Sequence, residues 1–171
     1  MKKALIIILF SLCLVVTGCG GAATAQGTSQ QNGFNFIFKH GVTGRNTLDT
    51  FQGTYTKDMI MDPAITTDLV LTKAEMDSIY QKMMEIDFFN YPDKFSVDVA
   101  DNETKTEVAP YPSYFFRVEY DGKTKELLWH AKYVNLDTPG EKLMELINLI
   151  RNIIESKDEY KALPEPSGGY L

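Results

Sequence analysis

The stretch that decides the fold is residues 114–130, which read YFFRVEYDGKTKELLWH. Two alternating runs flank Asp121-Gly122, and Asp-Gly is a preferred two-residue turn between antiparallel strands. Because the turn has a fixed length, it also sets the register of the two strands. The predicted partners across this hairpin are Tyr120 with Lys123, Val118 with Lys125, Phe116 with Leu127, and Tyr114 with Trp129. These residues share one face, which we expect to be the core face.

The same register places the intervening residues on the opposite face. Arg117 faces Glu126 and predicts a cross-strand ion pair, which contributes less than about 1 kcal/mol if it is exposed. Phe115 faces Leu128 beside that pair. If helices cover only the core face, Phe115 and Leu128 form an exposed apolar patch, and these four residues are our candidate partner surface. The competing expectation is that the long loop 91–112 covers the patch.

Further strands are predicted on both sides of this hairpin. Residues 34–40 alternate, with three phenylalanines on one face, and are typical of a half-buried strand. Residues 47–57 are rich in Thr, Phe and Tyr and are expected to pair back on the first strand, with Gly53 marking a bulge or a close backbone approach. The alternating residues 65–71 predict a third strand. Residues 95–99 predict an edge strand.

The first helix is predicted from a capping box. Thr72 and Glu75 stand three residues apart, so the hydroxyl can accept from a backbone N–H while the carboxylate reaches back. Apolar residues at helical spacing follow, and the helix is expected to end near Asp87 because Pro92 prevents continuation.

A second helix is predicted to begin at Thr138, with Thr138 as N-cap, Pro139 at the first helical position and Glu141 at the third. Its apolar stripe comprises Leu143, Leu146, Ile147, Ile150, Ile153 and Ile154. Two helices with one apolar stripe each would cover one face of a mostly antiparallel sheet. The sequence therefore predicts an α+β two-layer sandwich.

The N-terminal residues form a separate unit. Lys2 and Lys3 precede a nearly continuous apolar run, Ala4–Val16, which is followed by Thr17-Gly18-Cys19. A positive start, a short apolar run and small residues before a cleavage point are typical of a secretory signal. A membrane-spanning helix needs about twenty apolar residues, which is longer than this run.

The residues Val16-Thr17-Gly18-Cys19 resemble the lipobox of bacterial lipoproteins. The resemblance implies a diacylglycerol thioether on Cys19, cleavage before it, and a location at the extracytoplasmic face of the cell membrane. It divides the chain into a signal peptide (1–18), a lipidated cysteine with a flexible tether (19–33) and one α+β domain (34–171). The alternative is an ordinary signal peptide that contains a cysteine.

Charge and cysteine content exclude several function classes. Loss of Lys2 and Lys3 would leave 15 of the 17 basic side chains against 23 acidic ones. Such a domain is a poor candidate for nucleic-acid binding, which depends on clustered Lys and Arg. The only cysteines are Cys13 and Cys19, so the mature domain is expected to have no disulfide, cysteine nucleophile or cysteine-based zinc site.

Candidate chemical groups are few. The two histidines, His40 and His130, stand at predicted strand ends and could bind a metal with Asp49 or Glu119 if their strands are neighbours. We expect instead that they are solvated or hydrogen-bonded. The acidic run 98–103 lacks the spacing and central glycine of an EF-hand and is expected to be a solvated loop. No HExxH, GxSxG or glycine-rich phosphate loop occurs.

These observations lead to the expectation of a non-enzymatic binding or accessory domain, tethered to the membrane through lipid on Cys19 and able to bind a protein partner. No catalytic residue, metal or cofactor is assigned. One alternative is an inhibitor or immunity-type lipoprotein that uses its acidic surface against a basic target. The other alternative is a hydrolase of envelope polymers.

Overall fold

Seven strands form one sheet in the order β4-β3-β2-β1-β6-β7-β5. The structure is a computed structural model that describes residues 33–98, 104 and 106–170. The strands are β1 (Asn35–His40), β2 (Asn46–Asp49), β3 (Thr54–Met59), β4 (Asp62–Asp68), β5 (Lys94–Phe95), β6 (Ser113–Tyr120) and β7 (Lys123–His130). The helices are α1 (Lys73–Glu85), the 3-10 helix η1 (Phe88–Asn90), α2 (Thr138–Ser156) and α3 (Asp158–Lys161). All strand pairs are antiparallel except β5 with β7.

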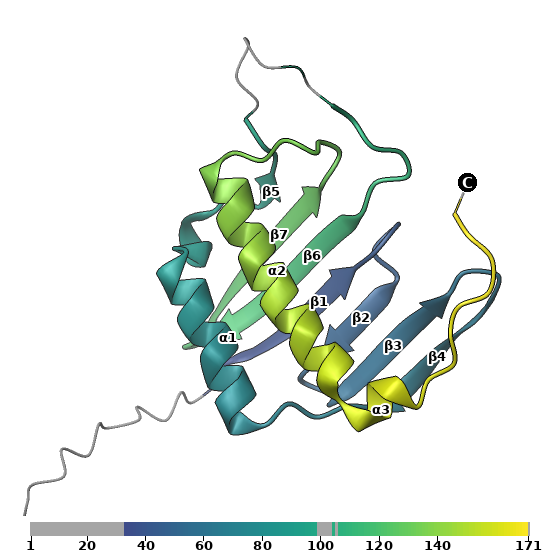
Figure 1. Cartoon of the computed structure of the whole chain (residues 1–171). Coiled ribbons are helices and arrows are strands. Elements are labelled where there is room, and N and C mark those ends of the chain that lie inside the picture. Colours follow the sequence, from purple (N-terminus) through teal and green to yellow (C-terminus); the bar gives the residue numbers. More distant parts are fainter. Residues whose placement is uncertain (1–32, 99–103, 105, 171) are drawn as a thin grey trace, which may run out of the picture. The chain divides into compact units, whose positions relative to one another are not determined.

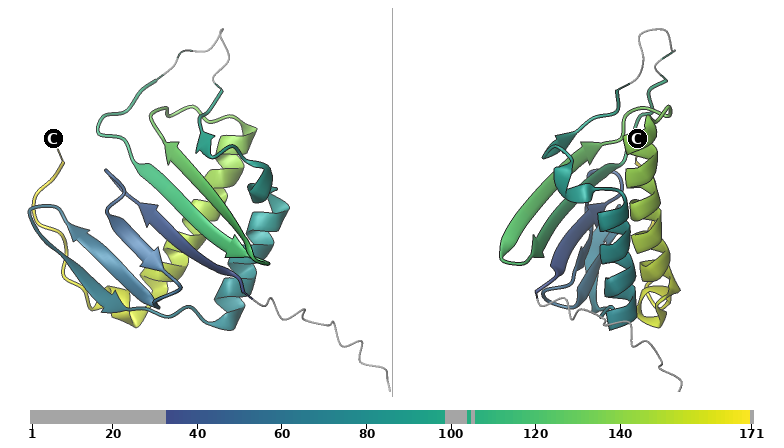
Figure 2. Two further views of the ribbon diagram at one scale, coloured as in Figure 1. Left: turned by 180° about the vertical axis from the view of Figure 1, so that it is seen from behind. Right: turned by 90° about the vertical axis from the view of Figure 1, so that its left-hand side faces the viewer.

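The two long helices lie against the same face of this sheet, as Figures 1 and 2 show. α1 and α2 pack side by side, and the reverse view in Figure 2 shows the other face of the sheet without a helix over it. The α+β class predicted from the sequence is therefore confirmed. The residues predicted as signal peptide and Cys19 lie outside the described residues, as does the predicted tether apart from Gly33.

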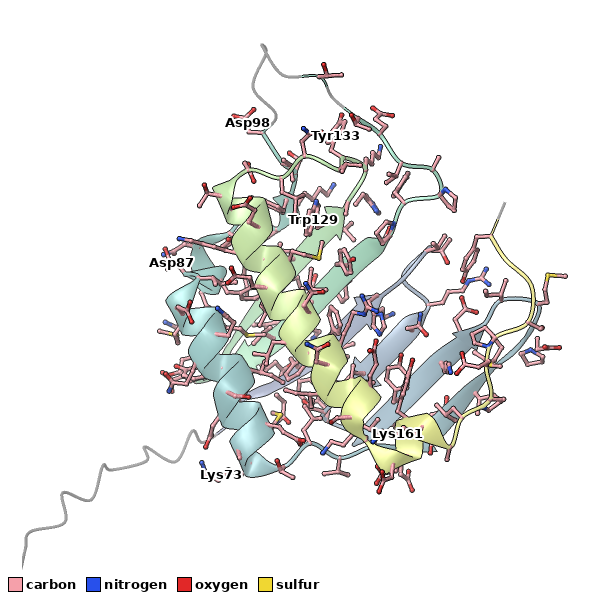
Figure 3. All side chains as sticks on the ribbon, in the orientation of Figure 1. Lys73, Asp87, Asp98, Trp129, Tyr133 and Lys161 are labelled. Carbon is pink, nitrogen blue, oxygen red and sulfur yellow. The ribbon has the colours of Figure 1, made fainter. Side chains whose placement is uncertain are left out.

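The hairpin register is confirmed at every predicted pair, including Phe116 with Leu127 and Tyr114 with Trp129. Phe116 and Leu127 are fully buried, and Trp129 lies on the helix side of β7 (Figure 3). Phe36 and Phe38 of β1 extend the same buried layer, since β1 pairs with β6. The core thus lies between the sheet and the helices, where an apolar stripe from each helix meets it.

The prediction of one strand over residues 47–57 is wrong in detail, because this range contains parts of two strands, β2 and β3, and the turn between them. β2 ends at Asp49, whose carboxylate accepts hydrogen bonds from the amides of Phe51 and Gln52 at 2.9 and 3.1 Å. Gly53 then adopts a φ of +65°, which glycine allows at little cost. The aspartate turn therefore folds β3 back on β2.

The two edge strands also differ from the predicted bounds. β4 begins at Asp62 and includes Pro63, which an edge strand tolerates because one side of it needs no ladder hydrogen bonds. β5 has only two residues, with Phe95 opposite Trp129 and Lys94 opposite Leu128. It is the edge strand predicted around Phe95, although Val99 lies outside the described residues.

The cap of α1 is confirmed and the cap of α2 is wrong. Thr72 accepts from the amide of Glu75, and Glu75 accepts from the amide of Thr72. The N-cap of α2 is Asp137 instead of Thr138, and its carboxylate accepts from the amide of Gly140 at 2.8 Å. The other oxygen of Asp137 accepts from the amide of Asp98 at 2.9 Å, so this carboxylate also fixes the preceding loop.

The C-terminal segment docks on the domain through contacts of Ser167 and Tyr170. Ser167 forms a bridge with Ile60, and its hydroxyl donates to Asp62 at 2.6 Å. The hydroxyl of Tyr170 donates to Asp58. The segment therefore runs beside β3 and β4, as the yellow end of the chain in Figure 1 shows.

Candidate functional site

The two histidines lie on opposite faces of the sheet. His40 ends β1 on the helix side, where its ring stacks on Phe38 at 5.0 Å. His130 ends β7 on the uncovered side, opposite Ser113. β6 also separates their two strands. The structure therefore does not bring the histidines together with Asp49 or Glu119, and the described residues contain no group of three His, Cys, Asp or Glu that could hold a metal ion.

A cleft of about 610 Å³ opens on the uncovered face and contains the predicted apolar patch. We call it the open-face cleft. Phe115 and Leu128 lie side by side on neighbouring strands and are half-buried, because no helix covers them. The residues that line the cleft are Lys39, Val42, Thr43, Gly44, Pro110, Tyr111, Ser113, Tyr114, Phe115, Leu128 and His130.

Two loops make the rim of the open-face cleft. The first turns at Gly41, whose φ is +95° and whose carbonyl accepts from the amide of Ser113 at 2.9 Å. The second brings Pro112 opposite Val42, and its carbonyl accepts from the amide of Ala131 at 3.0 Å. These backbone bonds hold the ends of β1, β6 and β7 together and place Tyr111 over the cleft.

Polar and aromatic groups meet around His130. Its Nδ1 lies 2.8 Å from the hydroxyl of the buried Ser113, and its ring packs edge-on against Tyr111 at 5.9 Å. The ammonium of Lys132 lies 5.3 Å from the centre of the Tyr111 ring, which is within the range of a cation–π contact. One end of the cleft is thus polar and basic, while its floor is apolar.

The Ser113–His130 pair does not have the geometry of a nucleophile with its base. In a serine hydrolase the base presents Nε2 to the serine, and a carboxylate holds Nδ1. Here Nδ1 itself contacts the serine, and no carboxylate among the described residues bonds to His130. The arrangement can hold a ligand through a hydroxyl and an imidazole.

A second, smaller cleft of about 440 Å³ adjoins the first and shares Leu128 and His130 with it. Its other lining residues are Lys94, Phe95, Ser96, Val97, Lys132 and Tyr133. Figure 3 labels Tyr133 just beyond β7, at the same end of the sheet. The uncovered surface around Leu128 and His130 is therefore hollowed on two sides.

A third cleft, of about 520 Å³, lies on the other side of the sheet between β1, β3, α2 and the C-terminal segment. We call it the helix-side cleft. The Nε2 atom of His40 lies 3.2 Å from the hydroxyl of Tyr55, and that hydroxyl lies 3.5 Å from the side-chain oxygen of Asn46. Burial, with a contribution from Arg151, lowers the pKa of His40 to about 4. Burial also raises the pKa of Tyr55, so both groups are neutral near pH 7.

The charged groups of the helix-side cleft are largely satisfied by one another. Lys57, although buried, has its ammonium 3.7 Å from Glu165 and 4.9 Å from the centre of the Tyr160 ring. Arg151 pairs with Glu155 at 3.1 Å. The C-terminal segment supplies Glu165 and Tyr170 to this network, so part of the wall of this cleft is made by contacts within the chain.

Of the four residues predicted as a partner surface, the structure brings two into a cleft. Phe115 and Leu128 form the floor, whereas Arg117 and Glu126 do not line it. The predicted Arg117–Glu126 ion pair is wrong, because the guanidinium pairs with Glu119 at 3.0 Å. Residues two apart on a strand share a face, so Glu119 competes with the residue directly opposite.

Among the described residues of the loop 91–112, the predicted cover of the patch is only partial. Pro110 and Tyr111, from the end of the loop 91–112, border the open-face cleft and leave its floor half-exposed. Of the acidic run, Asp98 contributes a backbone bond to Asp137, and Asp101 and Glu103 lie outside the described residues.

The sequence did not predict Lys39, Ser113 or Tyr111 as site residues. Alternation in β1 could have placed Lys39 on the uncovered face, since it is out of phase with Phe36 and Phe38. Nothing in the pattern could place Tyr111, because a loop with no periodicity carries it. The polar network around His40 also depends on a contact between β1 and β3 that no local pattern specifies.

No protein-family model matches this chain, and no curated protein matches its sequence. In the part of the chain that the structure describes, no helix is long and apolar enough to cross a membrane.

Proposed function

We propose that this chain is an extracytoplasmic lipoprotein, held at the membrane by lipid on Cys19, whose domain binds a ligand or partner in the open-face cleft without catalysing a reaction. The observation that supports the binding role is the position of Phe115 and Leu128. They form a half-exposed apolar floor inside a concavity on the sheet face that has no helix over it. Ligand sites in proteins are usually concave, mostly apolar and provided with a few convergent polar groups.

The anchor is tested by mass spectrometry of the mature protein. We expect a mature chain that begins at Cys19 and carries the mass of a diacylglycerol thioether, which provides the two acyl chains that stable anchoring needs. The matched variant Cys19→Ser should lose both the lipid and the membrane association. An unmodified Cys19 in the mature protein would contradict the anchor.

Binding is tested by cross-linking and recovery of partners from membranes. We expect the Phe115→Ala/Leu128→Ala variant to recover far less of any specific partner than the unchanged protein. The control is Val70→Ala/Met84→Ala, which truncates two exposed apolar residues outside the open-face cleft. Equal recovery by both variants and the unchanged protein would remove the cleft as the binding site.

A further inference from the structure

The residues that line the open-face cleft and its smaller neighbour carry only one sign of charge. Among the described residues, this lining includes Lys39, Lys94, Lys132 and His130 and no Asp or Glu. The whole chain has the opposite balance, with 23 acidic and 17 basic side chains. The uncovered hollow is therefore a basic region on an acidic protein.

These three lysines are among six basic side chains of the described residues that form no ion pair with another described residue, and the other three are Arg45, Lys123 and Lys142. Eight basic side chains in the described part of the chain form ion pairs with a carboxylate: Lys57, Lys73, Lys82, Arg117, Lys125, Arg151, Lys157 and Lys161. Lys39, Lys94 and Lys132 form no such pair with any described residue. Glu119 holds Arg117 and Asp93 holds Lys125 at 2.5 Å. Glu107, which is bridged to Tyr133, and Glu126, two residues before Leu128, form no ion pair with a described residue, but neither lines either cleft.

The polar groups converge beside the apolar floor. Ser113 and His130 offer a hydroxyl and an imidazole at one end, next to the ammonium of Lys132 over Tyr111. Phe115 and Leu128 offer an apolar surface adjacent to them. A ligand that matches this arrangement has an anionic group at one end and an apolar or aromatic body at the other.

We propose that the open-face cleft binds a small organic anion in which a carboxylate, sulfonate or phosphate is joined to an apolar ring or chain. This inference rests on the proposed binding role of the same cleft and adds the chemical class of the ligand. The volume of about 610 Å³ lies within the range of small-molecule sites. The anion replaces the carboxylate partners that Lys39 and Lys132 lack within the described chain.

The test compares two probes of the same shape, the anion indole-3-acetate and the neutral indole-3-acetamide, in which an NH2 group replaces one carboxylate oxygen. Binding of each to the full chain in detergent micelles is measured by ligand-observed NMR. Every variant is measured in the same micelles, so that partition of a probe into detergent cancels. We expect the carboxylate to bind more tightly than the amide, with an affinity that falls as salt is raised because exposed charges are screened.

Three variants separate the contributions. Lys39→Gln/Lys132→Gln should weaken indole-3-acetate by roughly fivefold or more, as loss of one or two exposed charge contacts predicts, and leave the amide unchanged. Lys123→Gln/Lys142→Gln removes the same total charge outside the two basic clefts and should change neither affinity. Phe115→Ala/Leu128→Ala should weaken both probes, because it removes the apolar floor.

The outcomes distinguish the charge inference from the proposed function. Equal affinity for both probes, lost in Phe115→Ala/Leu128→Ala, would overturn the anion and retain the binding cleft. Equal weakening by the two lysine pairs would also overturn the anion, since it would show an effect of total charge alone. Binding that Phe115→Ala/Leu128→Ala leaves unchanged would overturn both proposals.

Discussion

The helix-side cleft and the open-face cleft each contain one of the two histidines, and their surroundings differ in one respect. His40 lies among groups of the same chain that satisfy one another, from Tyr55 to the Arg151–Glu155 pair. His130 lies among lysines that have no carboxylate partner in the described chain, above an apolar floor. The helix-side cleft contains more ionisable groups, but most of its charged groups bond to one another. The lysines beside the open-face cleft have no carboxylate partner among the described residues, so they can contact a ligand.

This difference between the two clefts shows why shifted pKa values alone are a weak guide to a binding site. Burial lowers the pKa of His40 and raises the pKa of Tyr55. Such shifts occur in structural networks as well as in active sites. Here the hydroxyl of Tyr170 in the C-terminal segment donates to Asp58, so the network includes a contact between distant parts of the chain. Such a contact indicates a structural role.

The largest expected difference is between two adjacent residues of β6. Phe116 is fully buried on the helix side, whereas Phe115 is half-exposed on the uncovered side. Phe116→Ala should lower the free energy of unfolding by about 3–5 kcal/mol, the usual cost of truncating a buried aromatic residue. Phe115→Ala should cost less than about 1.5 kcal/mol, because much of its surface is already hydrated. Urea denaturation measures both, and similar losses would show that the two faces are equally buried.

The second prediction concerns His40 and pH. Its pKa of about 4 in the fold lies below the ordinary value of 6.5, so between these values the unfolded chain binds a proton that the folded chain does not. Stability should therefore fall as pH is lowered from 6.5 towards 4, by roughly 3 kcal/mol once both states are protonated. An NMR titration of the His40 ring gives the pKa directly.

The matched variants for this test are His40→Gln and His130→Gln. His40→Gln cannot titrate and should lose this part of the pH dependence, whatever its absolute stability. His130→Gln retains His40 and should therefore keep this part of the pH dependence of stability. An NMR midpoint near 6.5 for His40 would show that its surroundings are hydrated and that the helix-side cleft is open to solvent.

The third prediction tests whether the C-terminal segment closes the helix-side cleft. Tyr170→Phe removes the hydroxyl that donates to the buried Asp58 and should cost about 1 kcal/mol in urea denaturation. The control is Tyr111→Phe at the open-face cleft, whose hydroxyl makes no hydrogen bond to the described residues and which should change stability by less than about 0.5 kcal/mol. Faster amide exchange around Ser167 in Tyr170→Phe is also expected. Unchanged exchange and stability would show that the segment does not depend on this bond.

The sequence predicted those parts of the fold that depend on local pattern and turn chemistry. Asp121-Gly122 fixed every pair of the β6–β7 hairpin, and Thr72 with Glu75 fixed the start of α1. The same pattern placed Phe115 beside Leu128 on the face without helices. The fold class followed because both helices have a single apolar stripe.

The errors arose where two local solutions compete or where contact is distant in sequence. Asp137 and Thr138 are both good N-caps, and the carboxylate of Asp137 also satisfies the amide of Asp98 from another loop. The rim of the open-face cleft depends on Gly41 in a left-handed conformation and on the bridge between Val42 and Pro112. Such loop geometry carries no periodic signal, so the apolar floor was predictable and the walls were not.

The smallest predicted effect concerns the choice of partner by Arg117. The guanidinium lies 3.0 Å from Glu119 on its own strand, and both side chains are about two-fifths exposed or more, at 46% and 39%. A double-mutant cycle between Arg117→Ala and Glu119→Ala should therefore give a coupling of about 0.2–0.5 kcal/mol, the lower part of the range for exposed pairs. The cycle between Arg117→Ala and Glu126→Ala should give less, because the side chain directly opposite holds no bond to the guanidinium among the described contacts. A larger coupling to Glu126 than to Glu119 would support the cross-strand ion pair. It would show that Arg117 pairs with the residue directly opposite on the neighbouring strand in preference to a residue two positions away on its own strand.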